Sequence, residues 1–348
     1  MSLGPVMVDV QGTSLDDEER ELLRHPLVGA VILFSRNYQS PEQIKALVDE
    51  IHAVRDPRLL VAVDHEGGRV QRFRSGFAAL PAVRLLGEIY DHDKKRARHL
   101  AEEAGWVMAS ELRAVGVDFS FAPVLDLDLG RSGVIGNRAF HTQPAAAAEL
   151  AGAYMLGMRR AGMAATGKHF PGHGYAEADS HLAIPEDDRT LEDILQQDVL
   201  PYERLIANGM AAVMPAHVIY TRVDDKPAGF SPFWLKEILR KRLGFQGVIF
   251  SDDLNMEGAS VAGDYVARAE AALSAGCDMV LICNNRPAAW QILRGLHHDA
   301  DPVSQARLAR MHGLHPVGWS ELHDSPAWRQ AVAAVENIVP PQTLALDL

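Results

Sequence analysis

The sequence predicts an α/β fold: a single-domain (β/α)8 barrel, or TIM barrel, with a C-terminal helical extension. Eight short apolar runs rich in β-branched residues recur along the 348 residues, and segments with a helical period lie between them. Several of these runs are continuously hydrophobic, which is typical of parallel strands covered on both faces. Eight such repeats in a chain of this length favour a closed barrel, and a doubly wound open sheet is the alternative.

Each expected element has recognisable boundaries. The strands are bounded by glycine, proline or acidic residues and are expected at 5–10, 29–34, 59–64, 118–125, 164–168, 211–214, 247–251 and 278–283. Helices are expected at 40–54, 92–114, 144–161, 193–208, 234–243 and 265–275. Ser40 followed by Pro41 marks a helix start, because serine caps the helix and proline suits the first helical position. Thr190 ahead of Asp193 marks another.

The strand signal stops at about residue 295, which sets the expected domain organisation. The barrel is expected at about 4–295, and a helical extension at about 296–348, with Pro340 and Pro341 opening a short tail. No Ser/Gly-rich or Pro-rich linker separates two parts of the sequence. Residues 1–348 are therefore expected to form one catalytic domain.

Composition and charge exclude several classes of function. Hydrophobic residues make up 47% of the chain and charged residues 23%, as in soluble globular proteins. A formal net charge of -12 repels nucleic acid and anionic membranes. No run approaches the roughly 18 apolar residues of a membrane span, and the N-terminus lacks the basic start of a secretory signal. Cys277 and Cys283 lie in one expected strand and are interpreted as buried apolar groups, so a reducing, cytoplasmic location is expected.

Ionisable and amide side chains follow most of the expected strands and are scarce inside them. Because a barrel enzyme keeps its chemistry at the carboxyl ends of its strands, we expect these side chains to converge at one site. Taken in chain order from the third strand, they are Asp64, Asp126 and Asp128, Lys168 and His169, His217, Asp252 and Asp253, and Asn284, Asn285 and Arg286.

The segment 168–181 concentrates three histidines, a lysine and two carboxylates where the fifth strand ends. Asp179 lies two residues before His181, so its carboxylate can orient the imidazole and favour the protonated form, as an acid/base pair requires. One alternative is a surface loop whose histidines cap helices or face water. Another is a metal site that uses His169, His173, Asp179 and His181. A phosphate-binding loop is a weaker alternative, because the segment lacks a third glycine.

Two carboxylates, Asp252 and Asp253, directly follow the seventh strand. Alternation along a strand points them in opposite directions, so one faces the barrel mouth and the other caps the next helix or binds a neighbouring base. A carboxylate that faces an acid/base group across a barrel mouth is suited to glycoside hydrolysis. Helix capping by both residues is the alternative.

Four segments, in order along the chain, carry a family resemblance: 64–72, 136–140, 168–174 with 179–181, and 251–256. They resemble the signature segments of glycoside hydrolase family 3, in particular its bacterial cytoplasmic β-N-acetylglucosaminidases, which act in cell-wall recycling. The resemblance extends from about residue 5 to about residue 290, and the last ~50 residues lie outside it.

The resemblance implies a role for individual residues. Asp252 matches the nucleophile, His181 the proton donor and acceptor, and Asp179 its orienting partner. The positions that match sugar-binding residues are Asp64, Arg72, Arg138, Lys168 and His169.

The activity implied is that of a retaining exo-β-N-acetylglucosaminidase, which removes terminal β-linked N-acetylglucosamine through a covalent glycosyl-enzyme. The implied substrates are peptidoglycan-derived muropeptides. No metal or organic cofactor is expected, the partner is a small carbohydrate or muropeptide, and the protein is expected to be a monomer.

Four rival interpretations remain at the level of the sequence. The substrate's own acetamido oxygen could act as nucleophile, polarised by Asp252 and Asp253. Phosphate could replace water as acceptor, because a histidine acid/base does not repel it as a glutamate would. The histidine-rich mouth could hold zinc for the hydrolysis of an amide or phosphoester. A pure sugar-binding module is the least favoured, because binding alone gives no reason for the arrangement of Asp179, His181 and Asp252.

Overall fold

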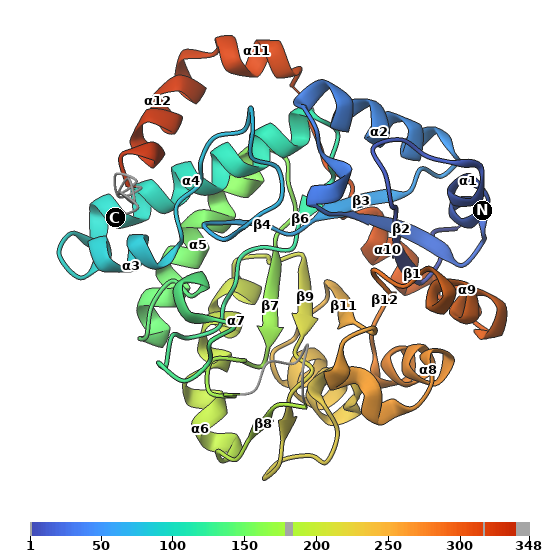
Figure 1. Cartoon of the computed structure of the whole chain (residues 1–348). Helices are drawn as coiled ribbons and strands as arrows, with labels where there is room; N and C mark the ends of the chain where they lie inside the picture. The colour runs from blue at the N-terminus through green and yellow to red at the C-terminus, as the bar shows by residue number, and fades with distance from the viewer. Residues whose placement is uncertain (1, 178–183, 316, 339–348) are drawn as a thin grey trace, which may run out of the picture.

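The protein is an eight-stranded parallel barrel surrounded by helices (Figure 1), as seen in a computed structural model that describes residues 2–177, 184–315 and 317–338. The hydrogen-bonded order of the barrel strands is β6-β3-β2-β1-β12-β11-β9-β7, and every pairing in this sheet is parallel. The strands are β1 Val6–Asp9, β2 Val28–Leu33, β3 Leu60–Val63, β6 Phe119–Ser120, β7 Thr166–Phe170, β9 Ala212–Pro215, β11 Val248–Asp253 and β12 Met279–Leu281.

The two ends of this sheet are joined beside β6. Val124 forms a parallel bridge with Lys168. The Leu125 N–H donates to the Lys168 carbonyl at 2.7 Å, and the Thr166 N–H donates to the Ala122 carbonyl at 2.8 Å. The predicted barrel is therefore confirmed, and the open-sheet alternative is wrong. The fourth strand is shorter than predicted, because Pro123 has no N–H to donate to a ladder.

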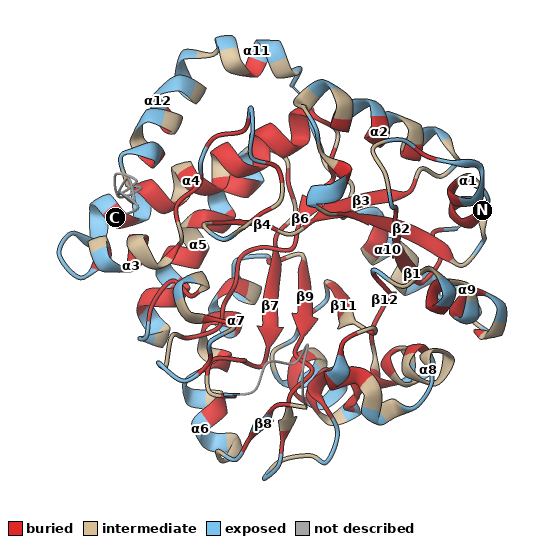
Figure 2. Ribbon diagram, in the orientation of Figure 1, coloured by how far each residue is buried: buried red, intermediate tan, exposed pale blue. Residues whose placement is uncertain are grey.

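Helices follow most of the strands and cover the outside of the barrel, and Figure 2 shows their buried faces turned toward it. The expected helices at 40–54, 92–114, 144–161, 234–243 and 265–275 are confirmed within a residue or two. Those near the barrel are α1 Asp17–Arg24, α2 Pro41–Ala53, α3 Arg84–Tyr90, α4 Lys94–Ala114, α5 Pro144–Arg160, α6 Leu191–Gln196, α7 Val199–Ala207, η4 Phe233–Arg242 in π-helical form, α8 Tyr265–Ala275 and α9 Arg286–Gly295.

The expected helix at 193–208 is two helices, α6 and α7. Pro201 lacks the N–H that would donate to the Gln197 carbonyl in a continuous helix, so a second helix begins at Val199 with the proline in its first turn. Both expected helix starts are confirmed. The Ser40 hydroxyl accepts from the Gln43 N–H, and Thr190 forms a capping box with Asp193.

Two small sheets lie on loops beyond the barrel. β4 His65–Gly67 and β5 Val70–Gln71 form an antiparallel pair directly after β3. β8 Glu186–Asp187 pairs in parallel with β10 Ile219–Tyr220. Both pairs extend loops that leave the carboxyl ends of barrel strands, so they help to shape the mouth of the barrel.

The barrel core is densely aromatic and apolar. Phe119, Phe121 and Phe250 are buried, and their ring centroids lie 5.3 to 5.4 Å apart. Cys277 and Cys283 are buried free thiols, as predicted. No helix in the described part of the chain is long and apolar enough to cross a membrane.

The C-terminal extension contains α10 Pro302–Ala309, α11 Trp319–Asp324 and α12 Pro326–Glu336, and two buried aspartates attach it to the amino ends of barrel strands. Asp278, just before β12, accepts from the Ser304 hydroxyl at 2.5 Å and from Arg307 at 3.0 Å. Asp118, just before β6, accepts from the Gly313 N–H at 3.0 Å. From there α11 and α12 run along α4 on the outside of the molecule (Figure 1).

Candidate active site

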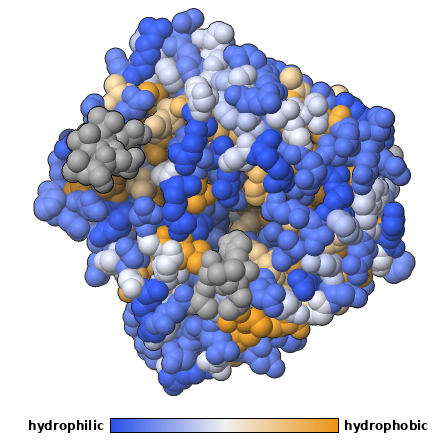
Figure 3. All heavy atoms as spheres, viewed as in Figure 1, coloured by the Kyte–Doolittle hydropathy of each residue, from blue (hydrophilic) through white to orange (hydrophobic). Residues whose placement is uncertain are grey.

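A cavity of about 720 Å³ opens at the carboxyl ends of the barrel strands. The face that Figure 3 shows, in the orientation of Figure 1, is predominantly hydrophilic. Six of the residues expected to converge line it, namely Asp64, Lys168, His169, Asp252, Asp253 and Asn284. Asp126 and His217 lie behind them in contact with lining residues. The other three do not line it: Asp128 pairs with Arg84, Asn285 caps α9 and Arg286 pairs with Glu19. The charged and polar lining includes Asp64, Glu66, Arg69, Arg72, Arg138, Lys168, His169, His173, Asp252, Asp253 and Asn284.

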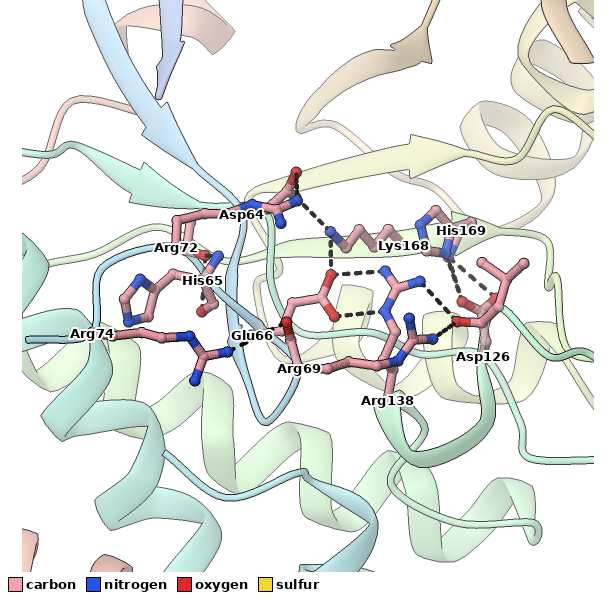
Figure 4. A network of polar contacts seen from close by, with 12 residues as sticks. Asp64, His65, Glu66, Arg69, Arg72, Arg74, Asp126, Arg138, Lys168 and His169 are labelled. Carbon is pink, nitrogen blue, oxygen red and sulfur yellow. Dashed lines mark hydrogen bonds and ion pairs between the residues drawn. The ribbon is translucent and has the colours of Figure 1, made fainter. Parts of the chain in front are cut away.

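Glu66 is the centre of a charged network on one wall of this cavity (Figure 4). Its two carboxylate oxygens accept from Nε and Nη2 of Arg138, each at 2.8 Å. The Lys168 Nζ lies 2.6 Å from Glu66 Oε1 and donates to Asp64 Oδ1 at 2.8 Å. The network therefore contains three of the five residues predicted to bind sugar: Asp64, Arg138 and Lys168. Its central residue, Glu66, had no role assigned from the sequence.

The network keeps its members charged. Burial alone would raise the pKa of Glu66, but Lys168 and Arg138 hold it well below its usual range. Burial alone would lower the pKa of Lys168, but Asp64 and Glu66 raise it. Within the described residues, Lys168 uses two of its three N–H groups on these carboxylates, which leaves the third for a ligand hydroxyl. The wall is thus an array of fixed charges suited to a polar ligand.

Arg72 completes this wall from the loop after β5. Its Nη2 lies 3.6 Å from Asp64 Oδ2, and its guanidinium stands over the Phe34 ring with 5.8 Å to the centroid. The contact with Asp64 is an ion pair at a distance too long for a good hydrogen bond. Arg72 therefore has donors to offer to a ligand bound beside Asp64.

His169 is oriented by Asp126, a buried carboxylate in the segment that follows β6. Its Nδ1 lies 2.7 Å from Asp126 Oδ2, and Asp126 also accepts from the His173 backbone N–H at 2.7 Å. Burial alone would raise the pKa of Asp126, but His169 and the His173 N–H lower it. An ionised Asp126 requires the proton of His169 to sit on Nδ1, so Nε2 is left for the cavity.

Asp252 and Asp253 differ in charge although they are adjacent in the sequence. Burial alone would raise the pKa of Asp252, but His217, His169 and the Asp253 N–H lower it below its usual value. Burial, with Asp252 and Asp9, instead raises the pKa of Asp253 to about 7. Asp252 is thus the charged member of the pair near neutral pH.

Asp253, the last residue of β11, has a structural role. Its Oδ1 accepts from the Asn255 and Cys283 backbone N–H groups, each at 3.0 Å. This arrangement ties the ends of β11 and β12 together and caps no helix. The alternative of helix capping by both aspartates is therefore wrong for Asp253.

His217, after β9, was expected at the site, but the sequence assigned it no specific role. It is buried, and its Nε2 lies 3.1 Å from the Asp253 carbonyl oxygen. A carbonyl only accepts, so Nε2 carries the proton. Burial lowers the pKa of His217, and the nearby Asp252 opposes that shift. Its position directly after a barrel strand was the available signal.

The segment after β7 is tightly packed as far as the structure describes it. The Tyr220 hydroxyl donates to the Gly172 carbonyl at 2.8 Å. A Cβ on Gly174 would lie 2.0 Å from the Leu127 carbonyl oxygen, so only glycine fits there. The predicted acid/base pair, Asp179 and His181, lies outside the described residues.

The metal-site alternative includes those same two positions. Among the residues that the structure describes, no three His, Cys, Asp or Glu side chains are grouped so as to hold a metal ion. Of the remaining two proposed ligands, His169 directs Nδ1 at Asp126.

A parallel barrel with a charged pocket at the carboxyl ends of its strands defines an enzyme of the (β/α)8-barrel class. The family follows from comparison with known proteins. Residues 5–310 match the glycosyl hydrolase family 3 N-terminal domain. The chain therefore belongs to glycosyl hydrolase family 3 and is a glycoside hydrolase.

Known proteins match this chain over nearly its full length. A protein of Thioalkalivibrio sulfidiphilus named beta-hexosaminidase is 60% identical over 348 residues, which is 100% of both chains. The crystal structure of NagZ from Neisseria gonorrhoeae in complex with N-trifluoroacetyl-D-glucosamine is 46% identical, with a TM-score of 0.92, over 98% of this chain and 99% of that one. A family 3 β-N-acetylglucosaminidase from Paenibacillus is 30% identical, with a TM-score of 0.85, over 96% of this chain and 66% of that one.

Proposed function

We propose that the chain is a retaining exo-β-N-acetylglucosaminidase that removes terminal β-linked N-acetylglucosamine. The observation that carries the proposal is the charged Asp252 at the end of β11, in one cavity with the network around Glu66. The names of the relatives and the N-trifluoroacetyl-D-glucosamine bound to the Neisseria protein support this choice of sugar.

In the proposed mechanism Asp252 attacks the anomeric carbon while His181, in its protonated form, donates to the departing oxygen. The products of this step are a covalent glycosyl-enzyme and the free aglycone. His181 then takes a proton from a water molecule, which attacks the same carbon from the opposite face. Two inversions give net retention, and Asp179 orients and tunes His181 throughout.

The charged wall is proposed to hold the terminal sugar. Asp64 accepts from sugar hydroxyls, while Lys168 and Arg72 donate to them. A ligand that leaves such buried charges unpaired loses their hydrogen bonds and keeps the cost of desolvation. Capture of a terminal sugar by several charged groups favours action at the chain end, with Arg138 and His169 completing the site.

We further infer the biological setting from the resemblance of the four signature segments. The natural substrates are muropeptides derived from peptidoglycan, and the enzyme acts on them in the cytoplasm, as a monomer, during cell-wall recycling. Residues 1–348 form a single catalytic domain, which the attachment of the extension through Asp118 and Asp278 supports.

The test is nitrophenol release from the β-N-acetylglucosaminide and from the β-glucoside, both in buffer with a strong chelator. We expect rapid cleavage of the first, with the second at least about 100-fold slower, because the glucoside lacks the acetamido group that the proposed site would bind. Equal rates of cleavage of the two substrates would contradict the proposed specificity for N-acetylglucosamine. If neither substrate is cleaved until zinc is added, the residues proposed as an acid/base pair would instead be metal ligands.

A further inference from the structure

The segment 71–80, which carries Arg72, is a small closed loop braced by one side chain. Gln71 Nε2 donates to the carbonyls of Phe73 at 3.1 Å and Ala78 at 2.9 Å. The Leu80 N–H donates back to Gln71 Oε1 at 3.0 Å. These bonds fix the shape of the segment but do not fix its position on the barrel.

Its position is set in part by the Tyr38 hydroxyl, which donates to the Ser75 carbonyl, and in part by a carboxyl group on α4. Glu111 is fully buried, and both of its oxygens accept from the Ala78 N–H, at 3.1 and 3.2 Å. Phe73 and Phe77 also pack with Tyr38, whose ring centroid lies 4.9 Å from that of Phe73 and 5.6 Å from that of Phe77. A buried polar group is costly unless it is hydrogen-bonded, and the Ala78 N–H is the hydrogen-bond donor that Glu111 has on this segment.

The C-terminal extension covers this contact from outside. Trp319 packs on Phe77 with 5.0 Å between ring centroids. His323 stacks between Trp319, at 4.2 Å, and Trp328, at 4.0 Å. Because His323 Nδ1 lies 2.8 Å from the Trp319 carbonyl oxygen, it carries the proton and Nε2 faces Glu111 Oε1 at 3.8 Å.

The extension is therefore attached at two places. Its first part is held at the amino ends of β6 and β12 through Asp118 and Asp278. Near the opposite end of the barrel, α11 reaches the segment 71–80 through Trp319, and α12 packs against α11 and α4. The segment lies between α4 and α11, which contact it at Ala78 and Phe77.

We propose that Glu111 and the C-terminal extension are positioning elements that hold Arg72 beside Asp64 for sugar binding. This inference rests on the proposed function, because it takes Arg72 as a sugar-binding residue. Glu111 acts through the segment 71–80 and touches no substrate.

The ionisation of Glu111 fits a positioning role. Burial raises its pKa to about 8, Glu336 acts in the same direction, and the Ala78 N–H and the Trp328 indole oppose it. The titratable groups that face it are His323 on α11, Glu336 on α12 and Tyr38. A protonated Glu111 still accepts from Ala78, so a glutamine can replace it near neutral pH.

The test is a double-mutant cycle read out as KM and kcat on the nitrophenyl N-acetylglucosaminide. Glu111→Leu and Trp319→Ala should each raise KM about tenfold with kcat within about twofold, because they weaken binding of the ground state and transition state alike. Either change should have almost no further effect in the Arg72→Ala background, since both act through Arg72. Independent, multiplicative effects in that background would overturn the proposal.

Two variants separate positioning from loss of stability. Glu111→Gln should restore KM to within about twofold of the wild type, because it keeps the acceptor for Ala78. Glu102→Ala is the control on the same helix. It removes an ion pair with Arg160 far from the segment 71–80 and should leave KM unchanged. A rise in KM in that control equal to that of Glu111→Leu would also overturn the proposal.

A measurement without substrate distinguishes this proposal from the proposed function. Amide hydrogen exchange over residues 73–80 should be faster in Glu111→Leu and unchanged in Glu102→Ala. Faster exchange with an unchanged KM in Arg72→Ala would refute the sugar-binding role of Arg72 and leave the attachment of the segment standing. Unchanged exchange would refute the attachment itself, whatever the enzyme cleaves.

Discussion

At the scale of single residues, the site separates two neighbouring carboxylates by their surroundings. Asp252 is surrounded by His217, His169 and Lys168, and these groups outweigh the burial that would raise its pKa. Asp253 has two backbone N–H groups as partners, and these do not offset its burial beside Asp252 and Asp9. The chain thus presents one charged carboxylate to the cavity while its neighbour is substantially protonated near pH 7.

This contrast predicts how stability depends on pH. The raised pKa of Asp253, about 7 against a usual 3.8, means that the folded state binds an extra proton between these values. The stabilisation is fully present below about pH 3.8 and is lost as the pH rises through 7. Asp253→Asn cannot titrate, so its free energy of unfolding relative to the wild type should rise by on the order of 2 to 4 kcal/mol between pH 4 and 8.

Urea unfolding across this pH range measures the difference. Asp301→Asn is the control, because the Val303 N–H lowers the pKa of Asp301 and its effect on stability therefore changes only below about pH 4. Its difference from the wild type should stay constant between pH 4 and 8. Parallel curves for the wild type and Asp253→Asn would contradict the raised pKa.

At the scale of elements, the strands were predictable and the partners of buried charges were not. Continuous apolar runs bounded by glycine or acidic residues located all eight barrel strands, because parallel strands are buried on both faces. The role of Glu66 depends on Arg138, which lies 72 residues away along the chain. No local pattern records such a pairing, so Glu66 and His217 had no assigned role. The short helices α1 and α3 were missed because each spans only about two turns.

The attachment of the C-terminal extension makes a prediction about stability. Asp278 accepts from the Ile249 N–H and from Arg240, each at 2.8 Å, besides its bonds to Ser304 and Arg307. Asp278→Ala leaves a largely buried guanidinium and a backbone N–H without their acceptor. We expect a loss of about 3 to 5 kcal/mol in the free energy of unfolding.

Denaturant unfolding at pH 7 measures this loss. Glu237→Ala is the control, because it removes an ion pair of similar length, 2.6 Å, between side chains that are 51% and 70% exposed. It should cause only the small change typical of an exposed pair. Equal effects of the two substitutions would show that burial does not set the strength of the Asp278 contacts.

At the scale of the whole molecule, the two ends of the barrel have different tasks. The amino ends of β6 and β12 carry the buried aspartates that hold the extension, and the carboxyl ends carry the charged cavity. The extension links the two, since it begins at one end and packs against the segment of Arg72 near the other. The family match stops at residue 310, so α11 and α12 lie beyond it. Only the structure shows that these two helices lie beside Glu111.

The central claim is that Asp252 forms a covalent bond with the sugar, and trapping that intermediate tests it most directly. The probe is the 5-fluoro derivative of N-acetylglucosaminyl fluoride, which keeps the acetamido group and slows release of the sugar. Intact-protein mass spectrometry should show one added sugar, peptide mapping should place it on Asp252, and Asp252→Asn should stay unlabelled. Turnover of the probe without any protein adduct would contradict the account and favour attack by the substrate's own acetamido oxygen.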